Sequence, residues 1–350
     1  MPDRSGSAND SQRVLASLCI VIAMLIGLLV PSIAEAFFPY IFHFLFLMVV
    51  FTFCALNANI LDIVGNVDNN TWLALVWQMA GIPALTALIC FLLNTDLLTT
   101  SVLIWTTTAG SVFASPAIAN MAGLDRGRSI RTMLLSTLAM PVSLLFFGEL
   151  TGVLPSDISL SNYVNHVVFF LLLPIVVAIA YWEAQPRLQR AMGPFVDRAM
   201  NGMATLALMG FCIGVMHKIH GTGPEHHNRL FEYLLLIMIV VVSAYVVTGL
   251  IFSHLGRRSA LTIGMLSANR NVALSFALLS DILPAEALKF VAVAQFPIFL
   301  APIIVHVSRI IEMPAWFAQL FRRSEKDTAS DSLDRQLGQG EPVQNGANAP

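Results

Sequence analysis

Ten apolar stretches, each about long enough to cross a lipid bilayer as a helix, follow one another along the 350-residue chain. A helix needs about 20 apolar residues to cross the hydrocarbon core of a membrane. Only 11% of the residues are charged, whereas a soluble domain carries roughly a quarter. The pattern predicts an all-α polytopic membrane protein. Its expected spans are 14–35, 38–58, 71–94, 98–121, 128–152, 162–182, 199–219, 229–253, 259–282 and 286–311.

The distribution of basic residues gives this span count an orientation. Loops rich in Lys and Arg lie on the cytoplasmic side of a membrane. With a cytoplasmic N-terminus over residues 1–13, fifteen of the 19 Lys and Arg residues fall inside, three fall outside and Arg270 lies within a span. The first apolar run is long for a cleaved signal peptide, so we expect it to be retained. The sequence predicts a multi-pass inner-membrane protein with both termini cytoplasmic.

Ten spans divide into two groups of five, at 14–152 and 162–311. An odd number of spans inserts the second group upside down relative to the first, and inverted repeats are typical of secondary transporters. The fourth span holds "AGSVFASPAIANMAG" and the ninth holds "LSANRNVALSFA", at equivalent positions. Beyond the spans, aromatic and basic residues predict an interfacial helix at 313–326. The polar composition of 327–350 predicts a disordered cytoplasmic tail.

Arg270 is the most unusual residue within a predicted span. A mid-helix arginine costs about 2.5–3.5 kcal/mol on insertion scales, so other groups must compensate its charge. Helical spacing places Ser267, Arg270 and Asn271 on one face, and a break in the helix would bring Asn269 to them. Three functions stay open. Arg270 bonds carbonyls freed by a broken helix, attracts an anionic substrate in an aqueous cavity, or takes the place of a bound metal cation.

The fourth span combines hydroxyl groups with a proline. Ser111 and Ser115 are followed by Pro116, which frees the carbonyl of Val112 from its helical partner. Freed carbonyls beside hydroxyls bind Na⁺ in discontinuous helices. The same residues also suit a kinked helix with close packing, so both interpretations remain.

Two further spans carry polar residues that could meet the fourth. Gln78 lies five residues before Pro83 in the third span, and Ser136 and Thr137 lie before Pro141 in the fifth. Each is either a cation ligand or a contact between packed helices.

Several classes of protein are not expected. No basic patch with interleaved aromatic residues is present, so we expect no nucleic-acid partner. No HExxH, GxSxG, Walker A or dinucleotide-binding motif occurs, so we expect neither an enzyme nor a cofactor. The four histidines of "HKIHGTGPEHHN" lie in a loop without assisting thiolates, and we predict no metal site there. The cysteines all lie in apolar runs and predict no disulfide: Cys19, Cys54, Cys90 and Cys212.

These features together resemble the bile acid:sodium symporter superfamily over about residues 14–311. The resemblance rests on "VPSIAEAFFPYIFHFLFLMVVFTFCALNANI", "WQMAGIP", "SVFASPAIANMAGLD", "LSTLAMP" and "SANRNVALS", in this order. It implies two inverted five-helix repeats, with the fourth and ninth helices broken and crossing at mid-membrane. It also implies an organic anion bound near that crossing, between a panel and a core of helices.

The resemblance assigns residues as well as a fold. Gln78 matches a sodium-ligand glutamine, Ser115 and Pro116 lie where the family has a Ser-Asn pair, and Ser136 and Thr137 fall near hydroxyl ligands. The ninth span departs from the family's Glu-x-x-x-Gln pattern. Ser267 stands at the glutamate position and Asn271 at the glutamine position, with Arg270 beside them. Losing a carboxylate and adding a fixed charge opposes classical two-sodium coupling.

The sequence therefore predicts a secondary active transporter of a small organic anion, embedded in the lipid bilayer. The expected substrate-binding residues are Arg270, Asn269, Asn271, Ser115, Pro116 and Ser111. The candidate ligands for a residual Na⁺ ion are Gln78, Ser136, Thr137 and Ser267. Two alternatives remain, a cation/proton antiporter of related architecture and a non-transporting membrane sensor. The antiporter normally needs intramembrane aspartates, and the short tail holds no signalling domain.

Overall fold

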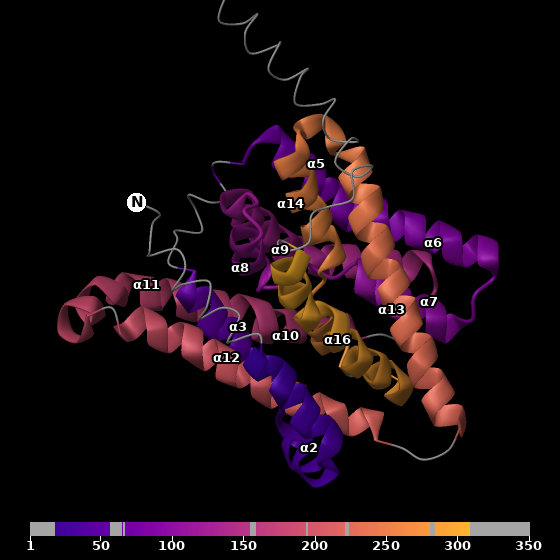
Figure 1. Ribbon diagram of the computed structural model, residues 1–350, viewed down its shortest axis with the longest axis horizontal. Helices are drawn as coiled ribbons and strands as arrows, with labels where there is room; N and C mark the ends of the chain where they lie inside the picture. Colours follow the sequence, from indigo (N-terminus) through magenta and orange to yellow (C-terminus); the bar gives the residue numbers. More distant parts are fainter. Residues whose placement is uncertain are drawn as a thin grey trace, which may run out of the picture.

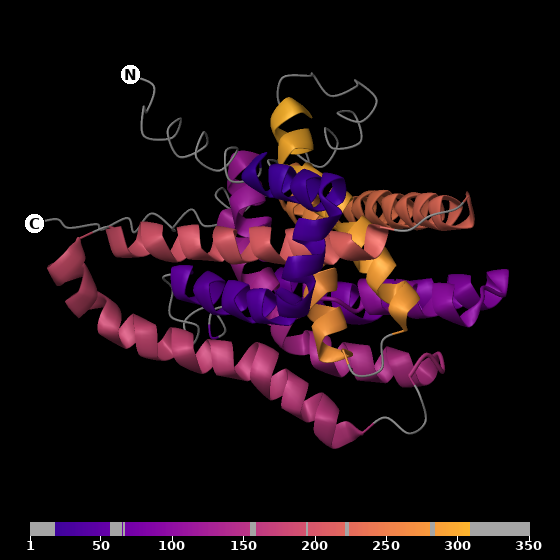
Figure 2. The same cartoon turned by 90° about the horizontal axis from the view of Figure 1, so that it is seen from below.

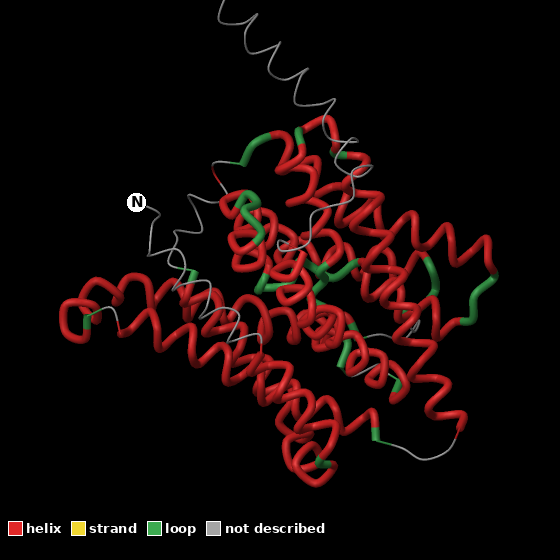
Figure 3. Tube along the Cα trace, viewed as in Figure 1, coloured by secondary structure: helices red, strands yellow, loops and turns green. Residues whose placement is uncertain are grey.

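The computed structural model describes residues 18–56, 65, 67–154, 159–193, 195–220, 224–280 and 284–308. All regular elements among these residues are helices, as the red trace in Figure 3 shows. Six of the described helices are long and apolar enough to cross a membrane: Pro31–Ala55, Asn69–Leu93, Arg126–Leu150, Leu160–Arg190, Ala199–Ile219 and His227–Ile251. The all-α prediction is confirmed. The expected N-terminus at 1–13, interfacial helix at 313–326 and tail at 327–350 lie outside the described residues.

The helices follow the apolar runs closely (Figure 1). A first helix covers Leu18–Leu29. The others, in chain order, are α2 Pro31–Phe37, α3 Ile41–Ala55, α5 Asn69–Val76, α6 Ile82–Leu93, α7 Leu97–Thr107, α8 Ser115–Met121, α9 Arg126–Leu150, α10 Leu160–Val167, α11 Leu173–Met192, α12 Phe195–Val215, α13 Pro224–Ile251, α14 Arg257–Ala268, α15 Val272–Leu278 and α16 Ala285–Ser308. One π-helical turn at Trp77–Gly81 joins α5 to α6, and another at Val168–Leu172 joins α10 to α11.

Two expected boundaries are wrong. The boundary between the first two spans lies at Val30 rather than near residue 36, because Val30 leaves the helical conformation and Pro31 begins α2. Proline suits the first helical turn, where its missing N–H has no partner to lose. The sixth expected span, 162–182, does not end at residue 182 but stays helical to Met192. It ends at Gly193, whose φ of +66° only glycine adopts readily.

The helices gather into two groups. In the first group, α3 packs against both α11 and α12, and the two long helices extend beyond the rest of the molecule (Figures 1 and 2). The indole N–H of Trp182 donates to the carbonyl of Cys54 at 3.2 Å and so joins α11 to the end of α3. The second group contains α5 to α9 and α13 to α16, with α13 packed along α14 and α16.

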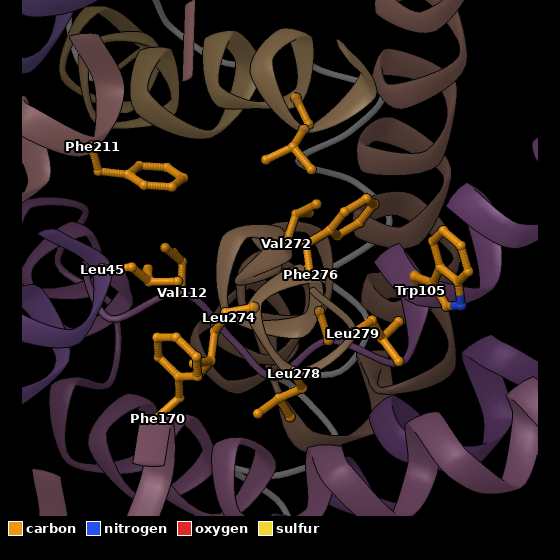
Figure 4. Close-up of a cluster of buried hydrophobic side chains, with 14 of the residues drawn as sticks. Leu45, Trp105, Val112, Phe170, Phe211, Val272, Leu274, Phe276, Leu278 and Leu279 are labelled. Carbon is orange, nitrogen blue, oxygen red and sulfur yellow. The ribbon is translucent and has the colours of Figure 1, made fainter. Parts of the chain in front are cut away.

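An apolar cluster around α15 joins the two groups (Figure 4). Leu45 of α3 and Phe211 of α12 lie on the side of the first group. Val272 and Phe276 of α15 belong to the second group, and Trp105 of α7 meets the ring of Phe276 edge-on at 5.6 Å. Burial of these side chains fixes α7 and α15 together.

Asp96 begins α7 and gives a prediction about pH. Hydrogen bonds to its carboxylate from the hydroxyl of Thr99, at 2.7 Å, and then from the backbone N–H of Thr99, at 2.9 Å, hold the pKa of Asp96 below its usual value. A lowered pKa means that this stabilisation is present above the unfolded pKa of about 3.9 and is lost as the pH falls through the folded value. We expect Asp96→Ala to lower the free energy of unfolding by about 1 kcal/mol at neutral pH.

Thermal unfolding at neutral pH and at about pH 3 tests this prediction. The difference between Asp96→Ala and the wild type should shrink at the acidic pH. Asp96→Asn, which keeps a capping oxygen, is the control and should stay near the wild type at neutral pH. A difference that is the same at both pH values would contradict the assignment.

Candidate functional site

The chain leaves the helical conformation at two places that cross each other. One break separates α7 from α8 at residues 108–114, and the other separates α14 from α15 at residues 269–271. Ser111 and Arg270 pair as an antiparallel bridge. The N–H of Val112 donates to the carbonyl of Asn269 at 2.9 Å, and the N–H of Asn271 donates to the carbonyl of Gly110 at 2.7 Å. The loop trace at the centre of Figure 3 is this crossing.

Local sequence explains why the helices break there. The amide oxygen of Asn271 caps α15 by accepting from the N–H of Leu274 at 3.3 Å. Pro116 lies in the first turn of α8, where a proline is tolerated. Because proline has no N–H to donate to the carbonyl four residues before it, α7 cannot continue as a regular helix through this position. The hydroxyl of Thr108 donates to the carbonyl of Ile104 at 2.7 Å at the end of α7. The two breaks therefore come from caps and a proline at their borders.

Gly110 allows the crossing to approach α9. A Cβ atom on Gly110 would lie 2.9 Å from Cα of Thr137 and 3.0 Å from its backbone nitrogen. The N–H of Ser111 donates to the hydroxyl of Ser136 at 3.0 Å in the same region. The site thus needs a residue without a side chain at this position.

Arg270 is 2% exposed and binds backbone carbonyl groups with all three of its nitrogen atoms. Its Nε donates to the carbonyl of Ser267 at 2.8 Å, Nη1 to that of Ala109 at 2.9 Å, and Nη2 to that of Gln78 at 3.2 Å. No carboxylate among the described residues pairs with it. Of the three functions left open by the sequence, these contacts match the first, an arginine that bonds carbonyl groups freed where helices break.

The expected sodium ligands gather around Ser111 in part. The hydroxyl of Ser111 lies 3.2 Å from Oε1 of Gln78 and 3.0 Å from the carbonyl oxygen of Leu266. Ser136 joins this group through the N–H of Ser111, whereas the hydroxyl of Thr137 donates back to Met133 of its own helix at 2.8 Å. The structure therefore joins Gln78, Ser111 and Ser136 by hydrogen bonds, and the described hydrogen bond of the Thr137 hydroxyl involves none of the three.

The expected substrate-binding residues also lie at the crossing, but with unequal freedom to bind. Asn269 uses its amide nitrogen to bind the carbonyl of Met265 at 3.2 Å. Asn271 keeps its amide nitrogen buried and without a partner among the described residues. The same holds for the amide nitrogen of Gln78 and for the hydroxyls of Ser115 and Ser267. Buried polar groups of this kind normally have a partner, so these four are the groups open to a ligand.

The two halves of the crossing differ in polarity. Around α7 and α15, the hydroxyls of Ser101, Thr106 and Ser275 all donate to carbonyls of their own helices. On the other half, built by α8, α14 and the beginning of α9, four buried hydroxyls have no partner among the described residues. They belong to Ser115, Ser129, Thr132 and Ser267. The hydroxyls of the first half are therefore satisfied within their own helices, although the indole N–H of Trp105 in α7 has no partner among the described residues. The second half keeps four unused hydroxyls.

The sequence indicated freed backbone carbonyls as one kind of acceptor for Arg270, but not which residues carry them. Two of these carbonyls belong to Ala109, which has no polar side chain, and to Gln78, which the sequence marked for its side-chain amide and not for its backbone. Gly110 beside Ala109 was the available signal, because a glycine within a span marks a close backbone approach. Within the described residues, no three His, Cys, Asp or Glu side chains gather as a metal site.

Comparison with protein-family models gives no match to this chain, and comparison with curated proteins gives none either. The resemblance to the symporter superfamily therefore remains a hypothesis based on the sequence motifs quoted above.

The close approach of Gly110 to α9 gives a stability prediction. Gly110→Ala should lower the free energy of unfolding by about 1–3 kcal/mol, because the added methyl group meets backbone atoms that cannot give way. Gly202→Ala in α12 is the matched control, since a Cβ there meets nothing within 4 Å. Thermal unfolding of the detergent-purified protein measures both. Equal melting temperatures for the two variants would contradict the packing described.

Removing the charge of Arg270 should destabilise the crossing strongly. Arg270→Met leaves three buried carbonyls without donors, and we expect a loss of about 3–5 kcal/mol in the free energy of unfolding. Arg229→Met is the control, because Arg229 is half exposed and forms an ion pair with Glu232 at 3.2 Å. Such a pair contributes about 1 kcal/mol or less. A loss for Arg270→Met no larger than that for Arg229→Met would refute the role of the guanidinium group.

Proposed function

We propose that this chain is a secondary active transporter of a small organic anion that works by alternating access. The observation that carries the proposal is the pairing of two broken helices around a fully buried arginine, beside unused hydrogen-bond donors. Irregular backbone at membrane depth is tolerated only where it is buried in protein or lines a cavity. Broken helices that meet in this way form the substrate and ion sites of many secondary transporters.

The finer architecture belongs to the same proposal. Ten spans would form two inverted five-helix repeats, with α7 and α8 as the broken span of one repeat and α14 and α15 as that of the other. The reciprocal hydrogen bonds from Val112 to Asn269 and from Asn271 to Gly110 support this, because they treat the two breaks alike. With the basic loops on the cytoplasmic side of an inner membrane, α8 and α14 would form the inner half of the crossing.

Arg270 would act as a built-in cation in place of sodium. Its guanidinium group already donates hydrogen bonds to the carbonyl oxygens that could otherwise bind a metal ion. Its single positive charge, which no described carboxylate neutralises, would favour an anion close by. The amide nitrogen of Asn271 and the hydroxyls of Ser115 and Ser267 would then donate to that anion. Transport would need no sodium gradient.

Uptake into proteoliposomes tests the function and its independence of sodium. A panel of carboxylates and sulfonates should contain at least one transported anion, and replacing Na⁺ by K⁺ should leave its initial rate unchanged. Arg270→Ala should lose transport, because it removes the charge and the three hydrogen bonds. Non-denaturing guanidinium should restore part of the rate, since the free ion fits the vacated carbonyls, whereas Na⁺ should not.

Arg229→Ala serves as the control, because Arg229 lies in an exposed ion pair far along the chain from the crossing. It should transport normally with or without guanidinium. Transport that needs Na⁺ in the wild type, or that survives Arg270→Ala unchanged, would refute the proposed role of Arg270. The absence of uptake for every anion in the panel would count against the transporter itself.

A further inference from the structure

The first two turns of α9 carry two arginines with unused buried donors. Nε and Nη1 of Arg128 and Nε of Arg131 are buried and have no hydrogen-bond partner among the described residues. A guanidinium group cannot give up its proton to escape this cost, because its pKa is far above neutral. Three buried donor nitrogens on two cations therefore lack an acceptor among the described residues.

Two buried hydroxyls lie on the neighbouring face of the same turns. Ser129 and Thr132 are both 0% exposed and have no partner among the described residues. They share a face with Asp125 and Ser136, since positions 125, 129, 132 and 136 follow the i, i+4, i+7, i+11 spacing of a helix. That face is held at both ends. The N–H of Asp125 donates to Thr262 of α14 at 3.1 Å, and the hydroxyl of Ser136 accepts from Ser111 at the crossing.

Asp68 is the carboxylate that pairs with Arg128. One of its oxygens lies 3.2 Å from Nη2 of Arg128, and the other accepts from the hydroxyl of Thr71. Burial alone would raise the pKa of Asp68, but the bond from Thr71 and the charge of Arg128 lower it below its usual value, so the carboxylate is ionised. Arg128, Arg131 and Asp68 together leave one positive charge.

A second ion pair shows what is unusual here. Arg229 and Glu232 are also 3.2 Å apart, but their side chains are 51% and 61% exposed, so water completes their hydrogen bonding. Arg128 is only 12% exposed. The forked donors of arginine match the paired oxygens of a carboxylate, sulfonate or phosphate. A single oxyanion would satisfy the free N–H groups and the excess charge at once.

We propose that Arg128, Arg131 and the hydroxyl of Thr132 form a second oxyanion-binding site, separate from the crossing, with Asp68 as its resident competitor. A small dissolved oxyanion binds the two guanidinium groups and displaces part of the Arg128–Asp68 contact. Binding at this site does not depend on the proposed transport function. Its natural ligand does: under that function, the transported anion stops here between the crossing and the cytoplasmic water.

Binding of succinate and of sulfate to the protein in neutral detergent tests the site without any transport. Titration calorimetry should detect binding to the wild type. Arg131→Gln and Thr132→Val should weaken it, Arg131→Gln by about tenfold or more, because each removes hydrogen bonds to a charged ligand. Asp68→Asn should tighten it about two- to fivefold, since it removes the competing carboxylate. The two directions of change keep the test informative if one variant folds poorly.

Matched variants at the exposed ion pair are the controls. Arg229→Gln and Glu232→Gln remove the same groups at the same separation and should leave binding unchanged. Equal affinities for the wild type, Arg131→Gln and Asp68→Asn would overturn the site. Thermal stabilisation by short-chain phosphatidylglycerol, with none by succinate or sulfate, would also overturn it, because the ligand would then be a lipid headgroup.

The outcomes separate this site from the transport function. Binding that depends on Arg131 and Asp68 in a protein that transports no anion of the panel upholds the site and refutes the transporter. A second outcome refutes the site alone. In it, Arg270→Ala loses transport, whereas Arg131→Gln and Asp68→Asn keep both wild-type transport and wild-type anion binding.

Discussion

A guanidinium group held by three backbone carbonyls is the interaction on which the centre of this molecule depends. Arg270 comes from the break between α14 and α15, Ala109 from the break after α7, and Gln78 from the π-helical turn between α5 and α6. Breaking a helix inside an apolar environment frees carbonyl groups that water cannot reach. A buried cation needs acceptors for the same reason. Each defect therefore compensates the other, and neither would be stable alone.

This mutual dependence also restricts what can move. The reciprocal bonds between residues 110–112 and 269–271 tie the two breaks into one unit, and Gly110 holds that unit against α9. A movement that separated them would expose the charge of Arg270 together with its carbonyls. Under the proposed alternating access, the crossing would move as one body. The apolar cluster between α15 and the group of α3, α11 and α12 would be the surface along which it moves.

Unused hydrogen-bonding capacity is distributed unevenly through this unit. The half around α7 and α15 satisfies its hydroxyls within its own helices, and its apolar side chains close around Phe276. The half around α8, α14 and the start of α9 keeps free hydroxyls and ends at Arg128 and Arg131. Among the described residues, the buried Ser and Thr hydroxyls without a partner all lie in α8, α9 and α14, whereas in α7 the indole N–H of Trp105 is unpaired. The resemblance to the symporter superfamily did not imply this asymmetry.

The sequence by itself determined the helices and the places where two of them are interrupted. Apolar length sets the spans, and capping side chains such as Asn271, with Pro116, decide where the backbone stops being helical. The sequence also marked Arg270, Gln78 and Ser111 as polar residues in apolar runs. Only the tertiary structure decided what Arg270 binds. Its partners are carbonyl oxygens, which every residue carries, and whether one is free depends on which broken helices cross rather than on any side chain.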